Sequence, residues 1–241
     1  MRIAMWSGPR NLSTAMMYAF GQRGDCAVWD EPFYAAYLAA TGLDHPMRDR
    51  IVAAGETRPD QVARLCTGSI PAGKAVFYQK LMTHHMLDEF PRDWLAEVRN
   101  VFLIRHPARV VASYVAKREA PEMDDLGFRQ QVDLLKTVRE MGQTPIVIDS
   151  ADIRADPETA LRGLCGALGL AFDPAMLSWP EGGHADDGVW AAHWYGAVHR
   201  STGFAGSEGD LPVLEGRYAR LAQEAMPFYE TMRSAGQRPS I

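Results

Sequence analysis

The sequence predicts a single α/β domain, with a parallel sheet of about five strands and helices on both faces. Three observations lead to this prediction. Short apolar runs, typical of buried parallel strands, alternate with segments that have a helical pattern. A chain of 241 residues is long enough to bury one large core. No internal repeat, low-complexity tract or linker divides residues 1–241 into separate units.

The first predicted strand, Ile3–Met5, leads through the turn Trp6–Thr14 (WSGPRNLST) into a helix-like segment. The first N–H groups of a helix lack intrahelical partners, and the helix dipole adds positive charge there. Arg10 adds a full charge, and the hydroxyl groups of Ser13 and Thr14 add neutral donors. The ATPase pattern G-x-x-x-x-G-K-[ST] is absent, since the turn contains no lysine. The alternative interpretation is an ordinary helix that Ser13 caps.

The second predicted strand, Ala27–Trp29, is followed by Asp30 and Glu31. The carboxyl ends of parallel strands share one rim, so Glu31 faces the same rim as Arg10. A carboxylate in a partly apolar cleft has its pKa raised toward the range of a general base, which makes Glu31 a candidate base. The alternative is a helix start that Asp30 caps.

A third apolar strand, Ala75–Tyr78, precedes Lys80 and the pair His84-His85. A histidine has a pKa suited to proton transfer, so His84 is a second candidate for the base or for a ligand of the acceptor. The alternative is one partly buried and one exposed helix histidine. Of the two candidate bases we favour Glu31.

The fourth predicted strand is the apolar run Val101–Ile104, and Arg105 follows at its carboxyl end. Pro107 suits the first position of the next helix, and Ser113 lies on that helix, eight residues after Arg105. Ligands of open α/β sheets bind beyond the carboxyl ends of the strands. Arg105 and the turn after the first strand are therefore expected on one rim.

These segments resemble the motifs of sulfotransferases that use 3′-phosphoadenosine-5′-phosphosulfate (PAPS). GPRNLST, residues 8–14, is similar to the family's 5′-phosphosulfate loop, and LIRHPARVVASY, residues 103–114, is similar to its 3′-phosphate motif. The block Val147–Asp173 is similar to the family's strand, acidic turn and "LGL" helix. The resemblance extends from about Arg2 to Asp173 and implies a three-layer P-loop-like fold.

The resemblance implies PAPS as co-substrate and assigns roles to individual residues. Arg105 and Ser113 would bind the 3′-phosphate. Lys80 and His84 have the K-x-x-x-H spacing of some bacterial members, in which Lys80 would help to neutralise the leaving group. Arg200 lies in a late basic segment of the kind that covers the adenine and the 3′-phosphate. The residues that would bind the 5′-phosphosulfate are Gly8, Pro9, Arg10, Asn11, Leu12, Ser13 and Thr14.

The phosphate loop departs from the family pattern at two positions. Leu12 stands where the family usually has glycine, which lets the backbone approach a phosphate freely. If the loop needs a positive φ, we expect Asn11 to provide it, because asparagine tolerates unusual backbone angles.

No metal cofactor is expected. A sulfuryl group carries less negative charge than a γ-phosphoryl group, so a Mg²⁺ clamp is not obligatory for its transfer. The histidines and cysteines form no metal-ligand pattern. Two alternatives stay open: a P-loop kinase with a degenerate phosphate loop, and a non-catalytic nucleotide-binding module that would leave Glu31 and His84 dispensable.

Two further regions are predicted. Residues 33–71 form a variable insertion on the acceptor side, with a helix that starts at Pro59. Residues 180–241 form a C-terminal cover and a helix. Within the cover, the aromatic segment 188–204 has the alternative interpretation of a hydrophobic cluster over the sheet edge.

The C-terminal helix is predicted over Leu211–Arg233, and Pro227 is expected to kink or break it.

Composition limits the partners. The net charge of −5 argues against nucleic acid, and no stretch approaches the roughly 18 apolar residues of a membrane span. The chain enters its first strand at once, which argues against a signal peptide. The odd, widely spaced Cys26, Cys66 and Cys165 indicate reduced thiols in a cytoplasmic protein. We expect a monomer or homodimer that binds a small-molecule acceptor.

Overall fold

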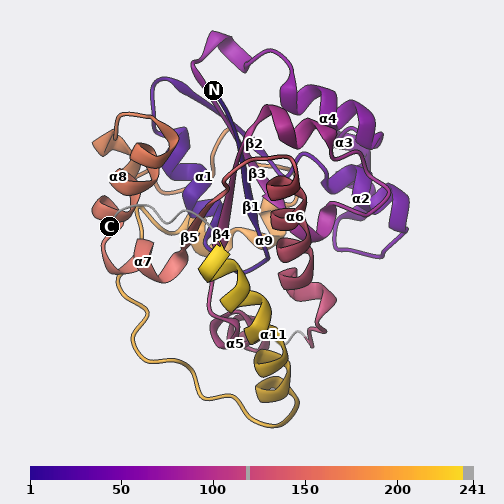
Figure 1. Cartoon of the computed structure of the whole chain (residues 1–241), viewed down its shortest axis with the longest axis vertical. Helices are drawn as coiled ribbons and strands as arrows, with labels where there is room; N and C mark the ends of the chain where they lie inside the picture. Colours follow the sequence, from indigo (N-terminus) through magenta and orange to yellow (C-terminus); the bar gives the residue numbers. More distant parts are fainter. Residues whose placement is uncertain (118–119, 236–241) are drawn as a thin grey trace.

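The computed structural model of the protein describes residues 1–117 and 120–235. Its centre is a five-stranded sheet in the order β2-β3-β1-β4-β5, in which all neighbours are parallel (Figure 1). The prediction of a five-stranded parallel sheet is confirmed. The strands are β1 (Arg2–Ser7), β2 (Cys26–Asp30), β3 (Val76–Met82), β4 (Arg99–Ile104) and β5 (Ile146–Asp149).

Helices cover both faces of the sheet. Trp6 of β1 belongs to a buried cluster with side chains of α4, α5, α6 and α11, whereas its neighbour Met5 belongs to a cluster with side chains of α1 and α8. Figure 1 shows α1, α7 and α8 on one side of the sheet and α6 and α11 on the other. The helices are α1 (Ser13–Gly21), α2 (Tyr34–Thr41), α3 (Arg48–Ala54), α4 (Pro59–Thr67), α5 (Pro107–Ala116), α6 (Phe128–Glu140), α7 (Ser150–Ala155), α8 (Pro157–Leu168), α9 (Ala191–Trp194), α10 (Gly196–His199) and α11 (Gly216–Ala235).

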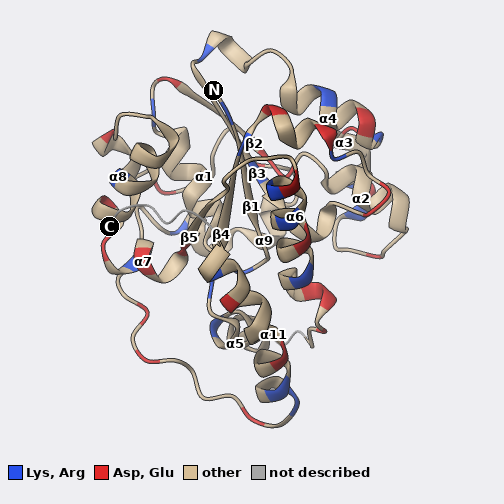
Figure 2. Cartoon of the chain, in the orientation of Figure 1, with Lys and Arg blue, Asp and Glu red and all other residues tan. Residues whose placement is uncertain are grey.

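The predicted insertion, residues 33–71, contains α2, α3 and α4, and α4 begins at Pro59 as expected. Pro59 suits this position because the first helical N–H has no partner to lose. Figure 2 shows basic and acidic side chains interspersed on the outer surfaces of α3, α4 and α6.

Strand β3 extends further than predicted. The prediction ended it at Tyr78, but the strand continues through Gln79 and Lys80 to Met82, and Lys80 is only 1% exposed. A lysine in a buried strand is rare unless its charge is paired. For this reason the sequence predicts an end of the strand before Gln79 and Lys80.

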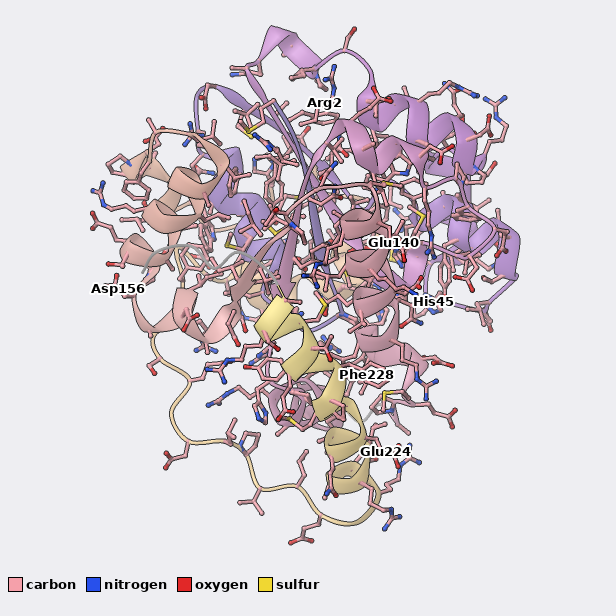
Figure 3. The ribbon with its side chains drawn as sticks, in the orientation of Figure 1. Arg2, His45, Glu140, Asp156, Glu224 and Phe228 are labelled. Atoms are coloured by element: carbon pink, nitrogen blue, oxygen red, sulfur yellow. The ribbon has the colours of Figure 1, made fainter. Side chains whose placement is uncertain are left out.

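The C-terminal helix begins at Gly216 rather than at Leu211. Pro227 lies inside it, so of the predicted kink or break the break does not occur. Glu224 and Phe228, on either side of this proline, lie on the same helix (Figure 3). Packing of α11 on α5 and α6 supports the helix on both sides of Pro227, and the Tyr229 hydroxyl donates a 2.6 Å hydrogen bond to Asp149 at the end of β5.

Two findings bear on the environment of the chain. Cys26, Cys66 and Cys165 are all buried and form no disulfide. None of the helices in the described part of the chain combines the length and the apolar character needed to cross a bilayer.

Gly8 fixes where the loop after β1 lies. A Cβ at this position would come 2.5 Å from the backbone oxygen of Leu126, just before α6. On the other side of this contact, Gly127 has a φ of 73°, and its carbonyl oxygen accepts a 3.0 Å hydrogen bond from the Thr83 hydroxyl. The two glycines therefore let the loop after β1 pack directly against the backbone that leads into α6.

We predict that Gly8→Ala lowers the free energy of unfolding by about 1–3 kcal/mol, because the new methyl group meets backbone rather than a movable side chain. Gly166→Ala is the matched control: it lies in α8 with no atom within 4 Å of a new Cβ, and it should stabilise by about 0.5–1 kcal/mol. Urea unfolding of both variants measures this. Wild-type stability of Gly8→Ala would contradict the close contact with residue 126.

Candidate functional site

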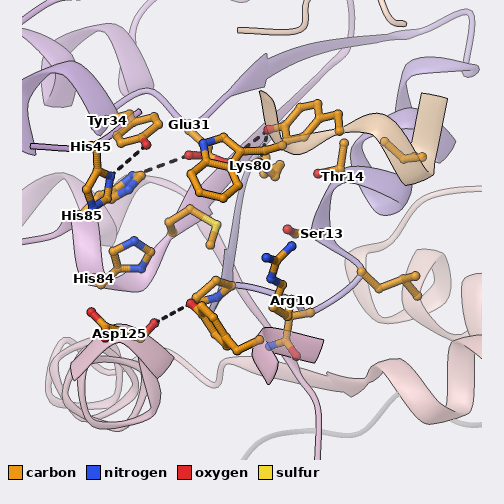
Figure 4. A pocket seen from close by; sticks show the side chains of 18 of the residues that line it. Arg10, Ser13, Thr14, Glu31, Tyr34, His45, Lys80, His84, His85 and Asp125 are labelled. Carbon is orange, nitrogen blue, oxygen red and sulfur yellow. Dashed lines mark hydrogen bonds and ion pairs between the residues drawn. The ribbon is translucent and has the colours of Figure 1, made fainter. Parts of the chain in front are cut away.

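A cavity of about 810 Å³ lies at the carboxyl edge of the sheet. Its walls come from the loop after β1, the ends of β2 and β3, the insertion and the C-terminal cover (Figure 4). Four of the residues predicted from sequence do not line it, namely Gly8, Arg105, Ser113 and Arg200. The predicted residues that do line it are Pro9, Arg10, Asn11, Leu12, Ser13, Thr14, Glu31, Lys80 and His84.

The phosphate loop adopts left-handed backbone angles without glycine. Arg10 has a φ of 62° and Leu12 a φ of 66°. The expectation that Asn11 provides the positive φ is therefore wrong. Its side chain is buried instead and donates a 2.9 Å hydrogen bond to the carbonyl oxygen of Leu103 in β4, which anchors the loop to the sheet.

The strained conformation of Leu12 costs on the order of 1–3 kcal/mol. Packing of its side chain against the apolar cluster around α1 and the Asn11 anchor offset this cost.

Helix α1 starts at Ser13 and has no side-chain cap, because Leu12 occupies the cap position. The interpretation of Ser13 as the cap is therefore wrong. The positive end of the helix dipole adjoins the cavity, and Ser13 and Thr14 line it. The Arg10 guanidinium lies 5.3 Å from the ring centre of Tyr114 and 6.0 Å from that of Trp194. This arrangement can bind an anion.

Lys80 of β3 holds two carboxylates, Asp30 and Glu31, at the carboxyl end of the neighbouring strand β2. Its Nζ donates hydrogen bonds to Asp30 at 2.9 Å, to the hydroxyl of Tyr195 at 2.6 Å, and to Glu31. An ammonium group has three donors, and these three contacts use all of them. Asp30 is therefore an ion-pair partner inside the site, and the interpretation of Asp30 as a helix cap is wrong.

Sequence reasoning missed Tyr195, which joins the C-terminal cover to this group of charges. Its hydroxyl accepts hydrogen bonds from Lys80 and from the Trp190 indole at 3.0 Å, and donates to Asp30 at 2.9 Å. Trp190 and Tyr195 also pack in a cluster with Tyr34 of α2. The aromatic residues of the cover were the signal available in the sequence. In the structure these residues contact the insertion and the cavity rather than an outer edge of the sheet.

The pKa of the Glu31 carboxyl group is raised within this cluster. Burial raises its pKa, Lys80 opposes the shift, Asp30 adds to it, and the net direction is upward. For Lys80, burial works against the charged form, but Asp30 and Glu31 more than offset this, so its pKa is raised. Glu31 Oε1 contacts Lys80 and Tyr195, whereas Oε2 lies 3.8 Å from His85 Nδ1.

Both histidines after β3 lie inside the site, so the prediction of one exposed histidine is wrong. They occupy a short 3-10 helix, Thr83–His85. Burial lowers the pKa of His84 to about 3 and that of His85 well below its ordinary value, so both rings are neutral near pH 7. The His85 ring lies between Tyr34 and Tyr37, with centroid separations of 4.4 and 4.8 Å.

Arg105 binds the backbone of the phosphate loop, residues 8–14, and does not line the cavity. Its Nη1 donates a 2.6 Å hydrogen bond to the carbonyl oxygen of Arg10. Ser113 lies on α5, and Arg200 is exposed at the end of α10, although Ser201 and Gly203 beyond it line the cavity. Among the residues that the structure describes, no group of three or more His, Cys, Asp or Glu side chains is arranged to hold a metal ion.

We predict that Lys80→Met lowers the free energy of unfolding by about 3–5 kcal/mol, because two buried carboxyl groups then lose their cation. Adding Asp30→Asn to this variant should restore part of the loss. Lys136→Met, a surface lysine whose side chain is 73% exposed, is the control and should change stability by less than about 0.5 kcal/mol. Equal unfolding midpoints of Lys80→Met and the control would contradict the buried ion pair.

Solved structures share the fold of this protein. The structure matches the "Sulfotransferase Domain from the Curacin Biosynthetic Pathway" with a TM-score of 0.57 at 15% identity, covering 99% of this chain and 98% of the other. It matches the "Sulfotransferase Domain from the Synechococcus PCC 7002 Olefin Synthase" with a TM-score of 0.50 at 16% identity, covering 92% and 93%. These likenesses confirm the predicted fold.

Two curated relatives from Arabidopsis thaliana carry a different name. "Branched-chain-amino-acid aminotransferase-like protein 1" is 37% identical over 233 residues, and "Branched-chain-amino-acid aminotransferase-like protein 2" is 34% identical over 232 residues. Each match covers 96% of this chain but only 41% of the relative, so the chain spans about two-fifths of their length. The family model for the sulfotransferase domain matches residues 1–236, and the chain therefore belongs to the sulfotransferase domain family.

Proposed function

We propose that this protein transfers a sulfuryl group from PAPS to a hydroxyl or amine of a small acceptor. One observation carries the proposal: a single cavity joins the anion-binding loop after β1 to the buried carboxyl group of Glu31. Transfer to a protonated nucleophile requires an anion site and a proton acceptor side by side, and this cavity would hold both.

The phosphate loop fits the 5′-phosphosulfate. With no side-chain cap on α1, its first N–H groups can serve an anion, and Arg10, Ser13 and Thr14 line the same part of the cavity. PAPS, when bound, supplies the sulfuryl group and a stable bisphosphate leaving group. Arg105 would bind the 3′-phosphate with Ser113, and its Nε is buried without a hydrogen-bond partner among the described residues.

Glu31 is the proposed base. Its raised pKa strengthens it as a proton acceptor, and its Oε2 lies 3.8 Å from His85 Nδ1, whereas Oε1 accepts from Lys80 and Tyr195. His84 is a weaker candidate, because a pKa of about 3 makes its ring a poor base. Lys80 is expected to hold Glu31 in position rather than to reach the leaving group, since its three donors are already engaged.

The insertion supports a binding site for the acceptor. Tyr34, Tyr37 and His45 line the cavity, and the Tyr34 hydroxyl lies 3.0 Å from His45 Nδ1. Together with His84 and His85 they form an aromatic wall beside Glu31. Such a wall fits a small acceptor with an apolar or ring-containing body.

The name of the curated relatives does not transfer to this site. An aminotransferase needs a lysine amine that becomes neutral and forms a Schiff base. The two carboxylates around Lys80 raise its pKa and favour the ammonium form instead. The names belong to proteins of which this chain covers 41%.

We predict that Glu31→Gln lowers turnover roughly 10²- to 10⁴-fold while leaving the affinity for 3′-phosphoadenosine-5′-phosphate nearly unchanged. Release of this product from PAPS with a panel of hydroxyl and amine acceptors measures turnover, and calorimetry measures affinity. The exposed Glu181→Gln is the control.

The pH dependence of turnover gives a second readout. The base is active when deprotonated, so wild-type turnover should rise with pH through a midpoint above 4.5, the ordinary value for glutamate. Glu31→Gln should lose this acidic limb. Unchanged turnover and an unchanged limb would assign the base elsewhere.

A further inference from the structure

Three arginine side chains from separate elements converge on one carboxylate. Arg105 follows β4, Arg109 lies on α5 and Arg154 lies on α7. Arg109 Nε is 3.2 Å from Glu208 Oε2, Arg154 Nη1 is 3.0 Å from Oε1, and Arg105 also contacts Oε1. The Glu208 side chain is only 4% exposed, although it belongs to the irregular segment 204–215.

The charges of this arginine cluster, Arg105, Arg109 and Arg154, are not balanced by its partner. Three guanidinium groups share the single carboxylate of Glu208. A phosphate monoester carries close to two negative charges and three acceptor oxygens, and it pairs well with the planar donors of arginine. The cluster is therefore better matched to a phosphate monoester than to the carboxylate that holds it.

The arginine cluster adjoins the cavity at two points. Arg105 donates to the carbonyl oxygen of Arg10 at 2.6 Å, and Arg154 Nε lies 3.4 Å from the carbonyl oxygen of Ala205. Arg10 and Ala205 both line the cavity. The arginine cluster is thus linked to the wall of the cavity through the backbone of Arg10 and of Ala205.

The segment that carries Glu208 is attached largely through the same arginines. Arg109 donates to the carbonyl oxygens of Glu208 at 3.1 Å and Gly209 at 2.5 Å. Gly209 has a φ of 67°, and beyond it Val213 is 91% exposed. Figure 1 shows this segment as the long loop that runs around the outside of the fold to α11. Exchange of one anion for another in the arginine cluster can therefore loosen the middle of the segment, between Phe204 and Leu214, which both pack against the core.

We propose that the arginine cluster binds the 3′-phosphate of the nucleotide and that the Glu208 carboxylate is an internal competitor for this site, displaced when the bisphosphate binds. This inference rests on the proposed function and adds to it Arg109 and Arg154 as determinants of 3′-phosphate specificity. When Glu208 occupies the arginine cluster in most molecules, only the remaining fraction can bind the bisphosphate. The apparent affinity is then the intrinsic affinity multiplied by that fraction.

Calorimetric titration with 3′-phosphoadenosine-5′-phosphate and with adenosine-5′-phosphate tests the competition. Glu208→Gln should bind the bisphosphate roughly tenfold more tightly and the monophosphate unchanged. Glu208→Asp, which keeps the charge but shortens the reach, should give a smaller gain and guards against a folding defect. Arg154→Gln should weaken bisphosphate binding alone. Asp210→Asn is the matched control, since it changes the net charge equally from an exposed position in the same loop.

The outcomes separate this inference from the proposed function. Wild-type preference for the bisphosphate, with no gain in folded Glu208→Gln or Glu208→Asp, would overturn the competition and leave the function standing. A gain in Asp210→Asn equal to that in Glu208→Gln would also overturn it, because the effect would then be one of overall charge. Absence of bisphosphate binding by wild type and by Glu208→Gln would overturn both.

Discussion

The buried ion pairs of Lys80 are the interactions on which the site depends. They join the carboxyl ends of β2 and β3 to Tyr195 of the C-terminal cover, and so close one wall of the cavity. Two carboxyl groups around one ammonium also leave an excess of negative charge among buried side chains. The structure relieves this excess by raising the pKa of Glu31, and the same shift provides the proposed base.

The two proposed anion sites are built in different ways. Next to β1, the proposed site consists of the uncapped start of α1, with Arg10 adding a full charge. Beyond β4, the charge comes from arginine side chains gathered from three elements, which must be balanced when no ligand is bound. The first site can stay open to water at little cost, whereas the second holds a carboxylate of the chain itself. Arg105 connects the two through the carbonyl oxygen of Arg10.

The parallel sheet with its flanking helices, and the part of the cavity wall formed by residues 9–14, could be predicted because they depend on local pattern. Buried parallel strands are apolar runs, and a turn that opens a helix leaves a readable motif, as in residues 8–14. The contacts of Tyr195 with Lys80 and of Glu208 with Arg105 could not be predicted, because the partners are 115 and 103 residues apart in the sequence. The left-handed Leu12 was missed because tertiary packing there outweighs the backbone preference of the residue type.

Calorimetric titration of the wild-type protein with 3′-phosphoadenosine-5′-phosphate, and separately with ATP and Mg²⁺, tests the central claim most directly. Micromolar binding of the bisphosphate, about −8 kcal/mol, with ATP at least tenfold weaker is the result that the site predicts. Tighter binding of ATP with Mg²⁺ would assign Arg10 and the start of α1 to a triphosphate. Binding of neither would mean that the loop formed around Leu12 no longer accepts a nucleotide.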